Sequence, residues 1–211
     1  TYRLATEKDL EVFKAAENYL EEKSQELFDK WGFDPVPDEE MPATMPGGIH
    51  PPSYGITKFG ELFNSRQKLA LITFVEKVRQ AHEKMLAEGY DEEYAKAVAS
   101  YLALTTNMTA AFTNTLARWE NTSEAIKHLY SRQALPMLWD YAEVNPFSTS
   151  SGSFETGQEY YYKAMEHCSH SNSIPATVTQ SSATSLPYSD NYFDAVITDP
   201  PYYYSVTYAD L

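Results

Sequence analysis

Four residues near the end of the chain, Asp199-Pro200-Pro201-Tyr202, combine a carboxylate, two rigid prolines and an aromatic ring. They follow an apolar run at residues 193–198, which has the length and β-branched content of a buried strand, and residues 188–191 supply a turn just ahead of this run. We therefore expect the carboxylate at the carboxyl end of a strand, where ligands bind in open α/β sheets. The alternative interpretation is a strand that ends in a proline turn, with Tyr202 as an ordinary half-buried aromatic.

These four residues suit the modification of a planar amine. An amino group conjugated to an aromatic base is a poor nucleophile, because its lone pair is delocalised into the ring. The Asp199 carboxylate and the Pro200 carbonyl can accept its two hydrogens, which favours the charge that builds on nitrogen during attack on a methyl donor. Pro201 fixes its own φ and restricts Pro200. Tyr202 offers a face on which an extruded base can stack.

The stretch that leads into this tetrapeptide, residues 182–202, resembles the one by which amino-methyltransferases enter their catalytic loop. These enzymes use S-adenosylmethionine to methylate adenine N6 or cytosine N4. Large adenine-specific DNA methylases that carry a conserved domain of unknown function show similar stretches to those at residues 54–67, 132–147 and 208–211. The resemblance runs from about Tyr2 to Leu211.

The resemblance implies a methyltransferase that acts on double-stranded DNA with its target base flipped, most naturally at adenine N6, in a restriction-modification or phage-defence setting. It also implies that S-adenosylmethionine is bound near Ser182 and Ala183, and that Tyr203, Arg66 and Arg132 contact the nucleic acid. The family usually has an acid where this chain has Ser182. No Gly-rich donor loop occurs in the chain, so we interpret it as an internal fragment that is inactive by itself.

Two alternatives remain open at this stage. The same type of tetrapeptide serves methyltransferases that act on RNA bases or on protein amides, which differ in substrate and share the transfer chemistry. The other alternative is a non-catalytic helical interaction module. A Gly-rich strand-to-helix turn in the natural continuation of the chain would favour an enzyme over a module. The identity of any partner subunit does not follow from the residues.

Composition places the chain among soluble globular proteins. Its 211 residues are 43% hydrophobic and 14% aromatic, which is enough to bury a core. No stretch resembles a membrane span or a signal peptide. The chain has one cysteine, Cys168, and the neighbouring His167 and His170 lack a second pair of metal ligands. We therefore predict no metal site and, from the absence of disulfides, a cytoplasmic location.

The net charge of −14 opposes simple binding to nucleic acid, because phosphate contacts need clustered lysine and arginine. Only residues 56–133 are near neutral, with 10 basic against 9 acidic residues. Any contact with a DNA backbone would come from this part, and the alternative is that most of its basic groups are solvated charges on helices. The candidate cations are Lys58, Arg66, Lys68, Arg118, Lys127 and Arg132.

Residues 1–150 are predicted to form an all-helical unit, a helical insertion or conserved domain with a possible role in DNA recognition. A first helix begins after the cap Thr6 and reaches toward Trp31. A Pro-, Gly- and acid-rich linker covers residues 32–52. A second helix begins at Asn64 or Ser65 and ends near residue 87. A third covers about residues 91–119, and a fourth about 122–132.

Residues 151–211 are predicted to be part of the methyltransferase domain. We expect a helix near residues 155–168 and two strands, at residues 176–180 and 194–198. The predicted fold class is therefore an α/β, Rossmann-like methyltransferase part preceded by a mostly α-helical insertion. The chain as a whole is expected to be predominantly helical.

Overall fold

A computed structural model describes residues 4–43, 50–130, 134–170 and 176–200. Helices dominate these residues, as predicted, and the strands in them form a two-stranded sheet. In chain order the elements are α1 (Glu7–Trp31), the 3-10 turns η1 (Pro51–Tyr54) and η2 (Phe59–Leu62), α2 (Ser65–Ala87), α3 (Glu92–Phe112), β1 (Arg118–Glu120), β2 (Ala125–Lys127) and α4 (Phe154–Ser169).

The first two helices begin at the predicted caps. The backbone N–H of Thr6 donates to Asp9 Oδ2 at 2.7 Å, and α1 ends at Gly32, whose φ of 80° closes the last turn. Asn64 and Gln67 cap α2 reciprocally, because each side-chain oxygen accepts the other residue's backbone N–H at 3.0 and 2.9 Å. The capping signals therefore fix where these helices start.

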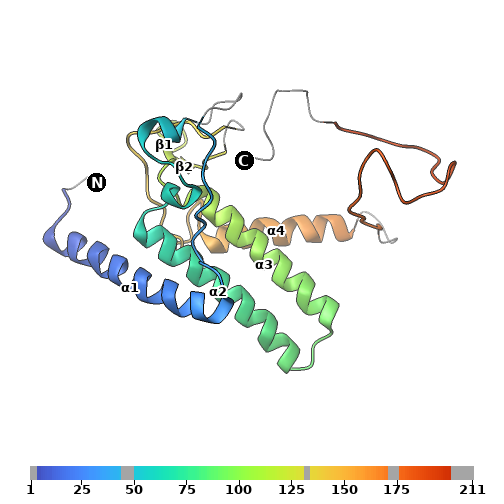
Figure 1. Ribbon diagram of the computed structural model, residues 1–211, viewed down its shortest axis with the longest axis horizontal. Helices are drawn as coiled ribbons and strands as arrows, with labels where there is room; N and C mark the ends of the chain where they lie inside the picture. Colours follow the sequence, from blue (N-terminus) through green and yellow to red (C-terminus); the bar gives the residue numbers. More distant parts are fainter. Residues whose placement is uncertain (1–3, 44–49, 131–133, 171–175, 201–211) are drawn as a thin grey trace.

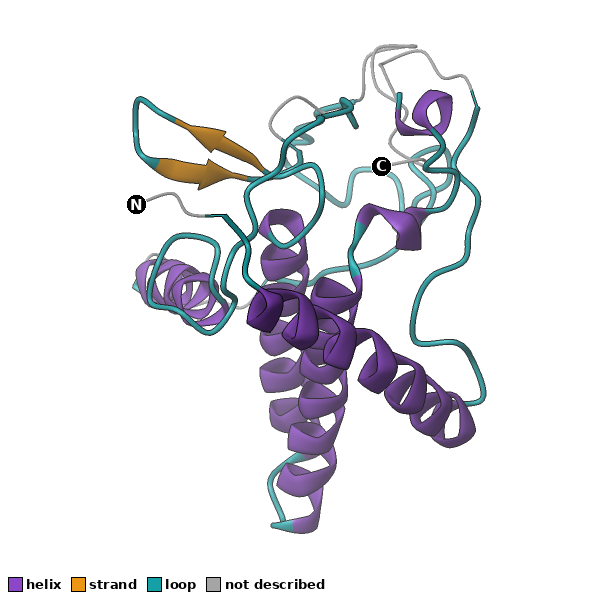
Figure 2. Cartoon of the chain, turned by 90° about the vertical axis from the view of Figure 1, so that its left-hand side faces the viewer, coloured by secondary structure: helices purple, strands orange, loops and turns teal. Residues whose placement is uncertain are grey.

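Helices α2 and α3 lie side by side and are joined by a short turn, with α1 against α2 and α4 against α3 (Figures 1 and 2). A buried ion pair connects α1 to α2: Lys23 Nζ lies 2.8 Å from Glu76 Oε2, and their side chains are 10% and 7% exposed. Gln80 Nε2 donates to the other Glu76 oxygen at 3.0 Å. The charged face of α1 thus meets α2 through a specific polar contact as well as through Leu27, which is fully buried.

Residues 39–41 of the linker pair with the segment at residues 57–59. Met41 N–H donates to the Thr57 carbonyl at 2.7 Å, and Phe59 N–H donates to the Glu39 carbonyl at 3.1 Å. A small apolar core forms where this linker meets the loops after α3. Its buried members are Met41, Leu62, Leu116, Leu129 and Leu135.

The helix predicted over about residues 122–132 is wrong for its described part, which forms a hairpin. Strands β1 and β2 pair antiparallel with Trp119 opposite Ile126, and the turn between them contains Glu124 at φ 47°. Pairing of the two strands satisfies backbone groups on both sides of this turn. Helix α3 also ends earlier than predicted, at Phe112, where Asn114 Nδ2 donates to the Ala110 and Ala111 carbonyls at 2.9 Å each.

Helix α4 confirms the prediction near residues 155–168, and it packs on the other helices. The Phe154 ring stacks on Phe74 of α2 at 4.6 Å, and Gly157 faces Thr105 of α3 closely enough that a Cβ would lie 3.4 Å from its methyl group. The helix that we assigned to the second part of the chain is therefore packed against the first.

The two strands predicted at residues 176–180 and 194–198 are wrong: both segments are irregular chain outside any described sheet. Val196 is 70% exposed and Ile197 is 97% exposed. A strand needs a neighbouring backbone with which to pair, and no described segment lies in that position. The described residues of this part, 151–170 and 176–200, accordingly do not show the expected α/β sheet.

Among the helices in the described ranges, none is both long enough and apolar enough to span a membrane.

Candidate functional site

The predicted catalytic loop lies at the end of a long exposed segment. Asp199 and Pro200 are exposed and directly follow residues 194–198, which form irregular chain. Pro201, Tyr202 and Tyr203 lie outside the described residues. The carboxylate therefore stands at the carboxyl end of the apolar run, as the sequence indicates, but without the sheet that was expected to support it.

An aromatic cluster organises the chain just before this run. The Tyr188 ring stacks on Tyr192 with centroids 5.1 Å apart, and Phe193 meets both of these rings edge-on at 4.8 Å. The turn between them contains Asn191 at φ 62°, a left-handed conformation that asparagine tolerates. The turn predicted ahead of the apolar run is thus present and is held by ring contacts.

The residues assigned to the methyl donor, Ser182 and Ala183, lie in an exposed turn. Ser182 Oγ lies 2.9 Å from Thr184 Oγ1 and accepts the Thr184 N–H at 3.3 Å, and Ser182 pairs with Ser185 as an isolated bridge. The polar groups of this turn are thus directed at one another. The turn by itself does not form a pocket that fits S-adenosylmethionine.

Arg66, which we assigned to DNA, makes a bidentate ion pair with Glu143. The guanidinium Nη2 and Nε donate to the two carboxylate oxygens at 2.7 and 3.1 Å. Asn64 Nδ2 donates to the same carboxylate at 3.2 Å and to the Tyr141 hydroxyl at 3.1 Å. The hydrogen bonds to Glu143 raise the pKa of Arg66 above its ordinary value despite the opposing effect of burial. A phosphate would have to compete with this carboxylate for the guanidinium.

Other candidate cations have carboxylate partners as well. Lys127 Nζ and Arg118 Nη2 lie 3.0 and 3.7 Å from Glu120, and these contacts follow from the register of the hairpin. Hydrogen bonds from Lys127 and from Ser123 lower the pKa of Glu120, which keeps it ionised. Arg132 lies outside the described residues. The structure therefore does not gather the described candidates around Asp199.

A shallow pocket of about 370 Å³ adjoins the Arg66–Glu143 ion pair, and its wall includes Gln67 and Thr113. Both residues are 99% buried, and two of their atoms, Gln67 Nε2 and Thr113 Oγ1, have no hydrogen-bond partner among the described residues. Gln67 is held in place by its capping contact with Asn64. Sequence reasoning could not detect this pair, because the two residues are 46 positions apart and meet only through the packing of α2 and α3.

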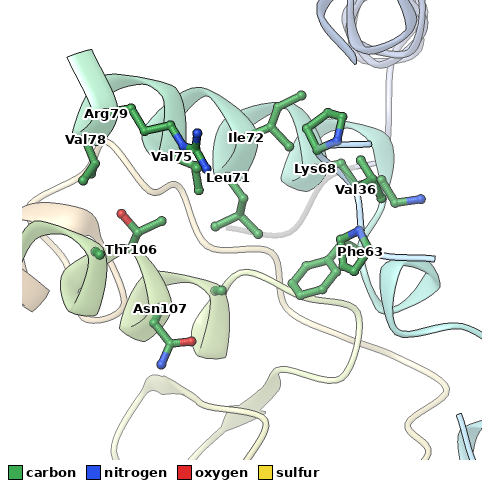
Figure 3. A pocket seen from close by; sticks show the side chains of 14 residues that line it. Val36, Phe63, Lys68, Leu71, Ile72, Val75, Val78, Arg79, Thr106 and Asn107 are labelled. Carbon is green, nitrogen blue, oxygen red and sulfur yellow. The ribbon is translucent and has the colours of Figure 1, made fainter. Parts of the chain in front are cut away.

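A larger pocket of about 440 Å³ lies between α2 and α3 and is closed on one side by the linker (Figure 3). Its wall is mostly apolar and carries two charged side chains, Lys68 and Arg79. The sequence signal for this pocket is the helical spacing of apolar residues on α2, which include Ile72, Val75 and Val78. Its residues are Pro35, Val36, Pro37, Phe63, Lys68, Leu71, Ile72, Val75, Val78, Arg79, Ala103, Thr106, Asn107 and Ala110.

No described group of three or more histidine, cysteine, aspartate and glutamate side chains is arranged to hold a metal ion. Comparison with known proteins adds no relative from which a role could be carried over: no family model, curated protein or solved structure matches the chain. Any function must therefore be argued from the residues themselves.

Proposed function

We propose that this chain carries the catalytic loop of an S-adenosylmethionine-dependent DNA methyltransferase that methylates an exocyclic amine, adenine N6. The observation that supports the proposal is the acid at position 199, followed by two prolines and a tyrosine and preceded by an apolar run. In this proposal Asp199 and the Pro200 carbonyl accept the amine hydrogens, Pro201 fixes the loop, and Tyr202 stacks on the extruded base.

The exposure of the apolar run is consistent with a segment that is completed by other strands. Val196 and Ile197 place aliphatic side chains in solvent on a backbone that has no sheet partner among the described residues. Burying both side chains in a sheet would gain about 3–5 kcal/mol. The proposal therefore requires further strands of a Rossmann-like sheet that pair with this run, and a pocket for the methyl donor beside it. S-adenosylmethionine would supply the methyl group there.

The experiment uses the complete natural protein that contains this chain, tritiated S-adenosylmethionine and duplex DNA. We expect label in DNA that contains adenine, and a loss of at least about 100-fold in rate on Asp199→Ala, because an acceptor for the reacting amine is removed. Asp194→Ala is the matched control, since Asp194 is another exposed acid of the same segment. Retention of activity by Asp199→Ala would refute the catalytic role.

The same assay distinguishes the substrate alternatives. Label that enters RNA or a protein amide, with the same dependence on Asp199, would keep the transfer chemistry and change the substrate. A duplex in which one strand contains only cytosine and thymine offers cytosine N4 as the only exocyclic amine on that strand. Incorporation of label into that strand would show that the enzyme methylates cytosine N4.

A helical interaction module is the second candidate, and the pairing of the cations favours it. Arg66, Arg118 and Lys127 each face a carboxylate, which leaves fewer basic groups for phosphates. Fluorescence anisotropy with labelled duplex DNA at several salt concentrations tests this candidate. If the complete protein binds neither DNA nor S-adenosylmethionine, the module is supported and the methyltransferase is excluded.

A further inference from the structure

The pocket between α2 and α3 has the size and wall of a small-molecule site. Its volume of about 440 Å³ falls in the range of about 300–1,000 Å³ that such sites occupy. Leu71, Ile72 and Val75 line one side from α2, and Phe63 closes one end (Figure 3). An apolar wall of this extent selects for an apolar ligand body, because binding removes both surfaces from water.

The charge of the wall is opposite to that of the chain. The chain carries 30 acidic against 16 basic residues, but the wall contains Lys68 and Arg79 and no carboxylate. In a protein of net charge −14 this makes the pocket a local exception. A ligand that complements it is therefore an anion.

Lys68 differs from Arg66, Lys77 and Lys84 of α2, because its side chain has no polar partner among the described residues. Arg66 is paired with Glu143, Lys77 donates to Gln80 at 2.9 Å, and Lys84 lies 3.7 Å from Glu88. The Lys68 side chain is half-buried and makes no ion pair or hydrogen bond to a described residue, whereas its backbone N–H donates to the Asn64 carbonyl at 2.9 Å. An ammonium group placed beside an apolar pocket without a partner is suited to a ligand anion.

Arg79, at the other end of the pocket, already has partners. Its guanidinium lies 4.5 Å from the centre of the Trp31 ring and 5.6 Å from that of Phe33. Lys68 and Arg79 are separated by eleven positions of α2, about 16 Å along the axis. One head group cannot bind both, so the head group belongs at Lys68 and the stem of Arg79 bounds the far end (Figure 3).

The part of the pocket wall that contains Val36 and Pro37 depends on a glycine, Gly60. A Cβ at Gly60 would lie 3.0 Å from Val36 Cγ1 and would collide with the Pro37 carbonyl oxygen. The absence of a side chain at Gly60 therefore lets the segment with Val36 and Pro37 close the pocket beside Phe63. This wall is built by packing and is not a chance gap between two helices.

We propose that this pocket binds a small apolar acid, with its anionic head group at Lys68 and its apolar body along Leu71, Val75 and Val78. The pocket is too small to hold a helix of a partner protein, and its charge selects against neutral and cationic molecules of the same shape. The proposal does not depend on the methyltransferase assignment, because none of the predicted catalytic residues lines this pocket.

The test uses calorimetric titration of the chain with decanoate, and with decan-1-ol and decyltrimethylammonium as a neutral and a cationic probe of equal chain length. We expect one decanoate per chain, at least about tenfold weaker binding of decan-1-ol, and no binding of the cation. Lys68→Met should weaken decanoate about tenfold and leave decan-1-ol unchanged, because it removes the charge and keeps the stem. Lys77→Met is the matched control on the same helix and should change neither.

A second variant tests the place of binding. Ala103→Trp fills the pocket from α3 and should abolish binding of decanoate, and Val75→Trp does so from α2 if the first variant does not fold by circular dichroism. Equal affinities for the three probes, unchanged affinity in Lys68→Met, or no binding of decanoate would each overturn the proposal. The proposal would also be overturned if the natural chain formed a dimer, Ala103→Trp converted this dimer to monomers, and decanoate did not bind. The pocket would then be occupied by a second copy of the chain.

Discussion

Replacing Lys23 with methionine should be among the most destabilising single changes on α1. The side chains of Lys23 and Glu76 are 10% and 7% exposed and lie 2.8 Å apart. Removing one member of a buried ion pair leaves the other charge without compensation, which costs about 3–5 kcal/mol. Gln80 still donates to Glu76 at 3.0 Å in the variant, so we expect the lower end, about 3 kcal/mol. For a chain of this length that corresponds to a fall of about 6–12 °C in Tm.

Urea unfolding followed by circular dichroism measures this loss. The double variant Lys23→Met, Glu76→Gln should recover to within about 1 kcal/mol of the natural chain, because no buried charge remains and Gln80 keeps a neutral partner. Lys84→Met is the matched control: its ion pair with Glu88 is 3.7 Å long and exposed, and its loss should cost less than about 0.5 kcal/mol. A cost below about 1 kcal/mol for Lys23→Met, or a double variant no more stable than the single one, would refute the reasoning.

The same ion pair predicts a dependence on alkaline pH. Burial alone would lower the pKa of Lys23, but its hydrogen bonds to Glu76 and Glu26 outweigh burial and raise the pKa above the ordinary value of 10.5. A raised pKa in the folded state means that the contribution of Lys23 is complete below pH 10.5 and is lost as pH rises through the folded pKa. The stability difference between the natural chain and Lys23→Met should therefore narrow at alkaline pH.

Three further changes test other parts of the fold. Gly152→Ala should cost about 3 kcal/mol in urea unfolding, because φ is +87° and the new Cβ would lie 2.9 Å from that of Phe112, whereas Gly89→Ala, at φ +85° with open space around it, should cost about 1–2 kcal/mol. Equal losses of stability in the two variants would contradict the predicted effect of the contact with Phe112. Thr113→Val should be neutral or stabilising by up to about 1 kcal/mol, because it removes a buried hydroxyl that has no partner, and a clear loss of stability would show that the hydroxyl is bonded in solution. Hydrogen bonds from the backbone N–H groups of Thr57 and Lys58 lower the pKa of Glu61, so its contribution to folding stability is present at neutral pH and is lost as pH falls through its folded pKa. Glu61→Gln should therefore reduce the loss of unfolding free energy at acid pH. An unchanged loss would contradict this.

The ends of the helices could be predicted because local chemistry decides them. Thr6 with Asp9 and Asn64 with Gln67 satisfy the first N–H groups within four residues of chain, so no distant segment is needed. The hairpin was missed for the opposite reason. The stretch around Ala125 to Lys127 is short, and its pairing with Arg118 to Glu120 depends on a turn at Glu124 that a helical pattern conceals.

The candidate site likewise has features that the sequence predicts and features that it does not predict. The acid, the prolines and the tyrosine are adjacent in the chain, so the sequence identifies them, and it also predicts the turn that the Tyr188 and Phe193 rings hold. The strand ahead of Asp199 could not be settled by sequence, because a strand exists only where another backbone accepts its hydrogen bonds.

The sequence by itself determined the helical character of the chain, the caps of α1 and α2, the linker and the position of the Asp-Pro-Pro-Tyr tetrapeptide, since each of these depends on residues within a few positions of one another. Only the tertiary structure decided that Lys23 meets Glu76, that Arg66 is occupied by Glu143, and that Lys68 stands without a partner at an apolar pocket. These contacts join residues about 50 or more positions apart, or depend on the gap that two packed helices leave between them. Such relations follow from how the helices pack, and a linear pattern does not encode them.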